Sequence, residues 1–498
     1  MTIPTPSSSP ILLSKCIVFP DQPSSVADLK LSVSDLPMLS CHYIQKGCLF
    51  TSTNLDQISL LDLLKSGLSR ALSRFPPLAG RLVTDDHGYV YIKCNDAGVE
   101  FIHANACEFF VRDLLVPGDL PEGFKEFFAF DRMVSFAGHF SPIMAVQITF
   151  LADGIFIGCS VNHAVTDGTS FWNFFNTFAE ECKAAKSTTT TKTITITPTP
   201  DFRRDSVLVS PAVLRLPPSG PEVTFSNDVP LRERIFSFSR ESILKLKAKT
   251  NEKKLVDNGD LTVTAVEIMG KQSNDMYCQN NGKVGSIFDS WYKNDTVTKQ
   301  HADSEAISMT TISSFQSLCA LLWRSVTRAR KLPPNKTTTF RMAVNCRHRL
   351  EPKLDPYYFG NAIQSIPTYA SAGDVLSRDL RWCAEKLNEN VIAHDNGMVR
   401  RFVENWEANP GMFPLGNADG ASVTMGSSPR FPMYENDFGW GRPLAVRSGR
   451  ANKFDGKISA FPNREGGGSI DLEVVLAPET MAGIESDSEF MQYVTAPN

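Results

Sequence analysis

Residues 144–168 read MAVQITFLADGIFIGCSVNHAVTDG. They contain two β-rich runs joined through Ala152-Asp153-Gly154, a composition typical of a hairpin turn. The residues after Gly168 place large apolar side chains at helical spacing. These side chains are Phe171, Trp172, Phe175, Phe178 and Ala179. The stretch therefore predicts a β-hairpin that leads into a strand-to-helix junction at 163–168.

Helical and extended patterns alternate on both sides of this junction. Apolar spacing predicts a helix from about Ser59 to Arg74, and Pro76-Pro77 ends it. Ser313 and Gln316 form a capping-box pattern that opens a second predicted helix at 313–330. Further patterns predict extended runs at 88–93, 338–344, 457–461 and 469–476, and a helix from about 478. The chain is therefore expected to be a mixed α/β protein without an internal repeat.

A Thr-rich stretch at 187–200 divides the chain, because it has too few large apolar side chains to pack a core. We predict an N-terminal domain at 1–190, a crossover linker at 191–230 and a C-terminal domain at 231–498. Within the last, residues 251–305 are rich in Asn, Lys, Asp and Gly, which predicts a mobile insertion. The insertion is either an interaction element or a surface loop without a function.

The composition bounds the class of protein. The 498 residues are 42% hydrophobic and 21% charged, as expected for an ordinary globular chain with two domains of roughly 200 residues. The net charge of -4 argues against a nucleic-acid binder. The 11 cysteines form no C-x-x-C pair, which indicates reduced thiols. Residues 1–10 carry no signal-peptide pattern and no stretch is apolar enough to span a membrane, so we expect a cytoplasmic protein that does not contact membranes. We also expect a monomer.

Two short motifs carry the chemistry. His163 and Asp167 fit the pattern H-x-x-x-D-G, in which a tight turn presents an imidazole while an acid anchors the turn. Because the chain has eight histidines, a packed histidine beside a surface aspartate is an alternative interpretation. The second motif is DFGWG at 437–441, whose match to five specified residues is much rarer by chance. Its alternative interpretation is a turn with packed aromatic rings.

Together with FPPLAGRL at 75–82 and YFGN at 358–361, these motifs resemble the plant BAHD acyltransferase family over nearly the whole chain. Their order is also similar, with DFGWG about sixty residues before the C-terminus. The resemblance implies two similar-sized mixed-sheet domains of chloramphenicol-acetyltransferase-like architecture, with a channel between them.

The resemblance also implies a reaction. His163 removes a proton from a hydroxyl or amine, which attacks the thioester of an acyl-CoA cosubstrate without a covalent acyl-enzyme. A general base of this kind typically contributes about 10²–10⁴-fold. Asp167, the other residue of the catalytic motif, pairs with an arginine to hold the turn, and Arg347 is the candidate partner. No metal and no permanently bound cofactor are expected.

The DFGWG motif is implied to be structural. Its residues are Asp437, Phe438, Gly439, Trp440 and Gly441, and they are expected to lie away from His163 and to shape the domain interface and the coenzyme channel. Coenzyme A carries phosphates, and the free amides at Ser313 and Ser314 open a helix where the family contacts coenzyme. Simple helix capping is the alternative role for these two serines.

Two departures from the family pattern stand out. Asn162 replaces a second histidine that many members have. Residues 426–430 read GSSPR, where hydroxycinnamoyl-transferring relatives read T-S-W-x-R. Loss of one oxyanion donor can cost about 10²–10³ in rate, and we hypothesise that Ser427 or Ser428 substitutes for it. With LPMLS at 36–40 and YIQKG at 43–47, the stretch is similar to a less characterised branch that includes an isochorismoyl-glutamate lyase.

Three functions follow from these observations. The first is acyl transfer from an acyl-CoA to a small plant metabolite. The second keeps the fold but cleaves a metabolite conjugate without coenzyme A, as the lyase does. The third is a non-catalytic protein that binds a ligand in the channel between the domains.

Overall fold

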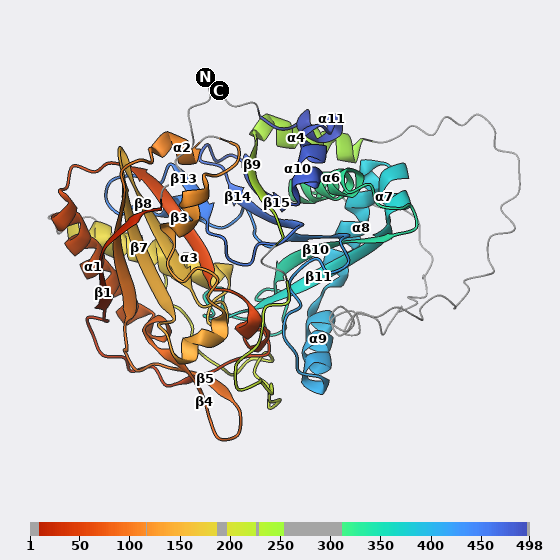
Figure 1. Cartoon of the computed structure of the whole chain (residues 1–498). Helices are drawn as coiled ribbons and strands as arrows, with labels where there is room; N and C mark the ends of the chain where they lie inside the picture. Colours follow the sequence, from red (N-terminus) through yellow and green to blue (C-terminus); the bar gives the residue numbers. More distant parts are fainter. Residues whose placement is uncertain (1–8, 116, 187–196, 226–228, 253–310, 496–498) are drawn as a thin grey trace, which may run out of the picture.

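The computed structural model describes residues 9–115, 117–186, 197–225, 229–252 and 311–495. Two six-stranded sheets lie side by side in these residues, one near each end of the view in Figure 1. A three-stranded sheet adjoins the first, and it consists of β2 (Leu29–Lys30), β5 (Val90–Lys93) and β4 (Arg81–Thr84). The mixed α/β fold that the sequence predicts is confirmed.

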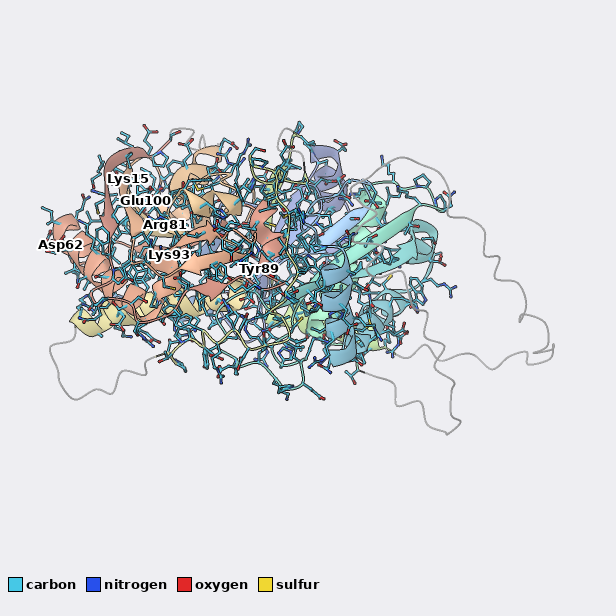
Figure 2. All side chains as sticks on the ribbon, turned by 90° about the horizontal axis from the view of Figure 1, so that it is seen from below. Lys15, Asp62, Arg81, Tyr89, Lys93 and Glu100 are labelled. Atoms are coloured by element: carbon cyan, nitrogen blue, oxygen red, sulfur yellow. The ribbon has the colours of Figure 1, made fainter. Side chains whose placement is uncertain are left out.

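The first sheet carries the junction at 163–168. Its strands, in order across the sheet, are β1 (Ile11–Val18), β6 (Val99–Ala106), β7 (Met144–Leu151), β8 (Gly154–Val161), β3 (Ile44–Thr51) and β13 (Ala445–Ser448). The predicted hairpin is formed by β7 and β8, which pair antiparallel. All residues of both strands are buried, which explains their nearly continuous apolar sequence. An ion pair of 2.7 Å between Lys15 and Glu100 joins β1 to β6 (Figure 2).

The second sheet is also mixed. Its strands, in order, are β11 (Ile363–Ser371), β10 (Thr337–Asn345), β12 (Ser422–Met425), β14 (Lys457–Pro462), β15 (Ile470–Leu476) and β9 (Arg232–Phe238). β12 lies between β10 and β14 and runs parallel to both, whereas the other pairs are antiparallel. The strands predicted at 338–344, 457–461 and 469–476 are therefore confirmed.

Helices cover the sheets and close two main cores. The described helices are α1 (Gln57–Arg74), α2 (Val111–Leu115), α3 (Gly168–Lys186), α4 (Arg240–Asn251), α6 (Ser314–Ala329), α7 (Ala372–Ser377), α8 (Leu380–Ala393), α9 (Asn396–Ala408), α10 (Pro478–Glu485) and α11 (Ser488–Met491). The apolar faces of α1 and α3 pack in the first core, and α4, α6, α8 and α10 pack on the second sheet. In Figure 1 these last four helices gather on one side of that sheet. By the hydropathy of the described helices, none is long and apolar enough to span a bilayer.

The predicted domain division needs one correction. We expected residues 231–498 to form the C-terminal domain, but β13 pairs antiparallel with β3 in the first sheet. The free backbone groups at the edge of β3 bind this returning segment, a pairing that the local sequence of 445–448 does not specify. Within the predicted linker, residues 197–225 form no helix or strand and bury Leu208 and Leu214 in the first core. The predicted insertion at 251–305 falls almost entirely outside the described residues.

Candidate active site

A cavity of about 600 Å³ lies between the two large sheets. Its wall includes side chains of β3 from the first sheet and of β10, β11, β12 and β14 from the second. His163, which lies two residues after the end of β8, also lines it. The strand-to-helix junction that the sequence predicts therefore delivers the imidazole to the space between the sheets.

Backbone hydrogen bonds on both sides fix His163. Its N–H donates to Ser135 Oγ at 3.0 Å, and its carbonyl oxygen accepts from Asn361 Nδ2 at 2.8 Å. Asn361 is itself anchored, because its backbone N–H and its Nδ2 donate to Asp35 Oδ1 at 2.7 and 2.9 Å. The Nδ1 atom of His163 has no hydrogen-bond partner among the described residues. The backbone of His163 is thus fixed on both sides, and its side chain lines the cavity.

The surroundings of His163 lower its pKa below the ordinary value of 6.5. Burial is the largest cause, because a low-dielectric site disfavours the charged imidazolium. The Lys457 ammonium lowers the pKa further, whereas weak contacts with the backbone and the Asp167 charge oppose the shift. The imidazole is therefore neutral at neutral pH, which is the form that accepts a proton.

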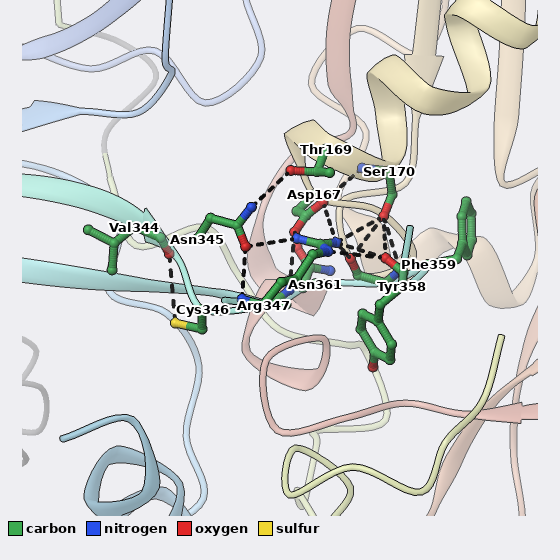
Figure 3. A network of polar contacts seen from close by, with 12 residues as sticks. Asp167, Thr169, Ser170, Val344, Asn345, Cys346, Arg347, Tyr358, Phe359 and Asn361 are labelled. Atoms are coloured by element: carbon green, nitrogen blue, oxygen red, sulfur yellow. Dashed lines mark hydrogen bonds and ion pairs between the residues drawn. The ribbon is translucent and has the colours of Figure 1, made fainter. Parts of the chain in front are cut away.

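Asp167 does not face the cavity but forms a buried ion pair with Arg347 (Figure 3). Two guanidinium nitrogens of Arg347 donate to its carboxylate oxygens at 2.6 and 3.1 Å. The backbone N–H groups of Ser170 and Ala362 donate to the same carboxylate at 2.9 and 3.1 Å. The predicted partner of Asp167 is confirmed, and all four donors hold the turn rather than orient the imidazole.

Arg347 extends this network to the YFGN segment. Its side chain also donates to the carbonyl oxygens of Tyr358 and Gly360 at 2.9 and 3.0 Å. Both members of the ion pair are buried, with exposed fractions of 2% for the Arg347 side chain and 0% for that of Asp167. Figure 3 shows the guanidinium between the start of α3 and the residues after β10. The pair therefore joins the His163 turn to the chain that leaves the second sheet.

Asn162, the first departure from the family pattern, is a buried anchor of the same turn. Its Nδ2 donates to the Ser135 carbonyl oxygen at 2.7 Å, and its Oδ1 accepts from the Ala164 N–H at 3.0 Å. These contacts use both ends of the amide. Asn162 therefore stabilises the loop before and after His163.

The DFGWG motif packs against α3 and does not contribute to the cavity wall. Asp437 Oδ1 accepts from the N–H groups of Gly439 and Gly441, both at 2.9 Å, and Oδ2 lies 2.6 Å from Lys183 Nζ on α3. Phe438 is fully buried and stacks on Trp440 with ring centroids 5.5 Å apart. The motif forms a folded turn that packs on the C-terminal half of α3 and lies away from the His163 cavity, as predicted. A role in shaping the coenzyme channel stays a prediction.

Ser313 and Ser314 also lie outside the cavity wall. Ser313 is the N-cap of α6, where its Oγ accepts from the Gln316 N–H at 3.3 Å and completes a capping box. The capping pattern read from the sequence is confirmed. The expectation of a free amide at Ser313 is wrong, because its N–H donates to Gln316 Oε1 at 3.0 Å and completes the capping box. A role of the Ser314 end of the helix toward coenzyme stays a prediction.

The GSSPR segment, the second departure, lies in the cavity wall. Gly426, Ser427, Ser428 and Arg430 all line it. The Gly426 N–H donates to the Ile458 carbonyl oxygen at 2.9 Å, and Ser428 Oγ accepts from the Arg430 N–H at 3.3 Å. The two serines are therefore placed on the same cavity as His163.

Sequence reasoning missed the lysines of this cavity, namely Lys46, Lys453 and Lys457. Lys46 lies on β3 and Lys457 begins β14, so they come from different sheets. A lysine within an otherwise apolar buried strand is itself unusual, because an ammonium group is rarely removed from water without a partner. That signal was present in IQKGCLFT at 44–51 and KISAFP at 457–462.

Comparisons with known proteins cover nearly the whole chain. The Transferase family model matches residues 12–491. BAHD acyltransferase DCR of Arabidopsis thaliana is 31% identical over 495 residues, covering 96% of this chain and 92% of the relative. Vinorine synthase has a TM-score of 0.69 at 19% identity, covering 98% of this chain and 99% of that one. TRI101 of F. sporotrichioides, complexed with coenzyme A and T-2, has a TM-score of 0.65 at 17% identity, covering 94% and 99%.

Proposed function

Because the chain belongs to the BAHD acyltransferase family, we propose that it moves an acyl group from an acyl-CoA thioester to a hydroxyl or amine of a small plant metabolite. The observation that carries the proposal is a neutral imidazole, His163, on the wall of a cavity large enough for a small substrate. Its backbone is fixed from both sides and its Nδ1 is unpaired.

His163 acts as the general base of this reaction. The neutral imidazole accepts the proton of the acceptor O–H or N–H while that atom forms a bond to the thioester carbonyl carbon. The electron pair of the carbonyl moves to oxygen and gives a tetrahedral intermediate. When this intermediate collapses, the C–S bond breaks, the ester or amide remains, and the thiolate takes the proton back from the imidazolium. The products are the acylated metabolite and free coenzyme A.

Asp167 serves the reaction by position alone. Its carboxylate is saturated by Arg347, Ser170 and Ala362, so it supplies no contact that orients the ring. Its contribution is to keep the turn at 163–168 in place between the two sheets. A displacement of the base by about 1 Å can cost on the order of a hundredfold in rate. The Asp167–Arg347 ion pair therefore affects the rate although it does not contact the substrate.

The developing oxyanion needs a hydrogen-bond donor, and Ser427 or Ser428 supplies it in this proposal. Both hydroxyls are on the wall of the cavity that His163 lines. Replacing both by alanine is expected to lower kcat by about 10²-fold. Unchanged turnover in the double variant would remove the two serines from the mechanism.

The test is thiol release from a small panel of acyl-CoA donors, each mixed with alcohol and amine acceptors. Wild type is compared with His163→Ala, and a colorimetric thiol reagent reports coenzyme A. We expect release that requires an acceptor and that His163→Ala lowers by at least about 10²-fold. The melting temperature of the variant should stay close to that of wild type, because the substituted side chain faces the cavity.

Two results would contradict the proposal. Acceptor-dependent release that survives in His163→Ala would remove the residue from its assigned role. Silence across the panel, together with His163-dependent cleavage of a metabolite conjugate in the absence of any thioester, would favour the lyase alternative.

A further inference from the structure

The charges on the cavity wall are one-sided. Lys46, Lys453, Lys457, Arg349 and Arg430 line it, and no aspartate or glutamate is among the lining residues that the structure describes. A cavity bounded by one sign of charge concentrates ligands of the opposite sign. The wall therefore favours an anionic ligand over a neutral one.

The three lysines differ in how they are neutralised. The Lys453 ammonium lies 2.6 Å from Glu233 and 3.1 Å from Glu473, so two carboxylates behind the wall hold it. Neither Lys46 nor Lys457 forms a hydrogen bond or a salt bridge with a described residue. Lys46 Nζ lies over the Phe461 ring, 4.6 Å from its centroid. Among the described residues, Lys453 therefore takes both carboxylates, and Lys46 and Lys457 line the cavity without a carboxylate in contact.

Burial deprives the Lys46 and Lys457 ammonium groups of water that no described side chain replaces. It lowers the pKa of Lys46 and the pKa of Lys457 to about 8, although the charge of Glu473 opposes the shift in both. An ammonium with a pKa near 8 is still mostly protonated at neutral pH, so both groups present positive charge to a ligand. An anion placed between them would restore the interaction that water provides in the unfolded chain.

Gly426 makes room for one of these groups. A Cβ added at Gly426 would collide with Lys457 Nζ, far inside van der Waals contact. The absence of a side chain at Gly426 therefore allows the Lys457 ammonium to occupy its position on the cavity wall. Because the obstructing atom is the far end of a flexible side chain, an alanine at 426 would move the ammonium rather than prevent folding.

The anion belongs close to the reacting groups. Lys457 lines the same cavity as His163, and its charge lowers the pKa of that imidazole. The phosphates of coenzyme A are separated from its thioester by the whole pantetheine arm, so they do not fit a site beside the base. The wall also carries the aromatic rings of Phe171, Phe402 and Phe413, which suit an apolar body attached to the anion.

From this arrangement we infer that Lys46 and Lys457 bind a carboxylate of the substrate, next to His163 and attached to an apolar or aromatic body. The inference deepens the proposed acyl transfer and rests on it for the identity of the reaction. The carboxylate is carried either by the acceptor or by the acyl group, as in a dicarboxylic acyl-CoA. Each lysine contributes a charge-assisted hydrogen bond to one carboxylate oxygen.

Binding is measured first, because it does not require turnover. The full-length chain is titrated calorimetrically with cinnamate and malonate and with their neutral amides. We expect the carboxylates to bind wild type on the order of tenfold to a hundredfold more tightly than the amides. Lys46→Gln/Lys457→Gln should erase this difference. Gly426→Ala, which keeps every charge but displaces Lys457, should reduce it.

Lys93→Gln is the matched control, because Lys93 is an exposed lysine of β5 that is absent from the cavity wall (Figure 2). It should keep the full preference for the carboxylates. Circular dichroism and melting curves confirm that each variant is folded before it is titrated. Equal binding of acids and amides to wild type, or a preference that survives in the double lysine variant, would overturn the inference even if acyl transfer itself is established.

Turnover then assigns the source of the carboxylate. One arm compares acceptors that differ only as acid and amide, and the other compares dicarboxylic with monocarboxylic acyl-CoA donors. We expect the lysine variant to lower kcat/KM for the acid at least about tenfold more than for its neutral partner in one arm. An equal loss for acid and neutral substrates in both arms would assign the lysines to the chemistry and contradict carboxylate binding. Absence of any turnover would count against the proposed function and leave the titration to decide the site.

Discussion

Asp167 and Arg347 form a two-contact ion pair, with nitrogen–oxygen distances of 2.6 and 3.1 Å, between residues 180 positions apart in the sequence. Both side chains are removed from water. Backbone N–H groups also donate to the Asp167 carboxylate, and a backbone carbonyl oxygen accepts from the Arg347 guanidinium. It links the turn that carries His163 to the segment that leaves β10. The position of the base is therefore a property of both large sheets and not of the H-x-x-x-D-G motif alone.

Breaking this pair should destabilise the fold. Removal of one partner leaves a buried charge, so Arg347→Ala is expected to lower the free energy of unfolding by about 3–5 kcal/mol, measured by urea denaturation. Asp167→Asn/Arg347→Met should lose less than the sum of the two single variants, because it leaves no unpaired charge. Additive losses would show that the two side chains do not act as a pair.

The acid limb of activity should report the pKa of His163. Because burial and Lys457 lower this pKa below 6.5, the base stays neutral to lower pH, and kcat/KM should fall only below that value. Lys457→Gln removes a positive charge, so the pKa rises and the limb moves to higher pH. The profile is measured with a neutral acceptor and a monocarboxylic donor. A limb that stays in place in Lys457→Gln, or that moves equally in Lys93→Gln, would contradict the coupling.

Stability should fall as the pH is lowered from about 7 to about 5. Burial, with the Arg349 charge, lowers the pKa of His394 to about 4, and its Nε2–H donates to Gln364 Oε1 at 2.8 Å. The unfolded chain takes up a proton near pH 6.5, so it binds more protons than the native state in this window. The loss for this residue is on the order of 2 kcal/mol at about pH 5. His394→Gln, which does not titrate, should show a shallower pH dependence in urea unfolding.

Asp437→Ala should lower stability and spare the chemistry. The side chain accepts from two backbone N–H groups and pairs with Lys183, so its loss is expected to cost about 1–3 kcal/mol. Because the motif does not line the cavity, kcat should change by less than about threefold. Lys183→Gln is the control, since this half-exposed ammonium contributes at most about 1 kcal/mol. A loss of kcat at unchanged stability would place the motif in the reaction.

The coenzyme prediction for the start of α6 can be tested with added charge. Ser314→Glu places a carboxylate in the first turn of α6. The carboxylate interacts favourably with the helix dipole but repels a phosphate. If coenzyme A binds there, KM for acyl-CoA should rise about tenfold without a loss of melting temperature. Gln57→Glu, at the exposed start of α1, is the matched control. An unchanged KM in Ser314→Glu would leave this helix end with its capping role alone.

Local sequence predicted the elements because local forces form them. The hairpin of β7 and β8, the helix after Gly168 and the capping box of α6 all depend on periodicity or on residues within one turn. The Asp167–Arg347 pair was also predicted, but through a family resemblance rather than through spacing. The contacts of Asn361 with His163 and Asp35 were not predicted, since nothing within YFGN indicates which distant groups it will meet.

The sequence by itself determined the strand-to-helix junction and the family to which the chain belongs, and it singled out His163 as the proposed base. Only the tertiary structure decided that β13 returns to the first sheet, that DFGWG clamps α3, and that Lys46 and Lys457 meet at one cavity with His163. The physical reason is the sequence distance over which each kind of interaction acts. Periodicity and capping act within a few residues, whereas sheet edges and buried charges choose partners by geometry in space, and a single sequence carries no local record of that choice.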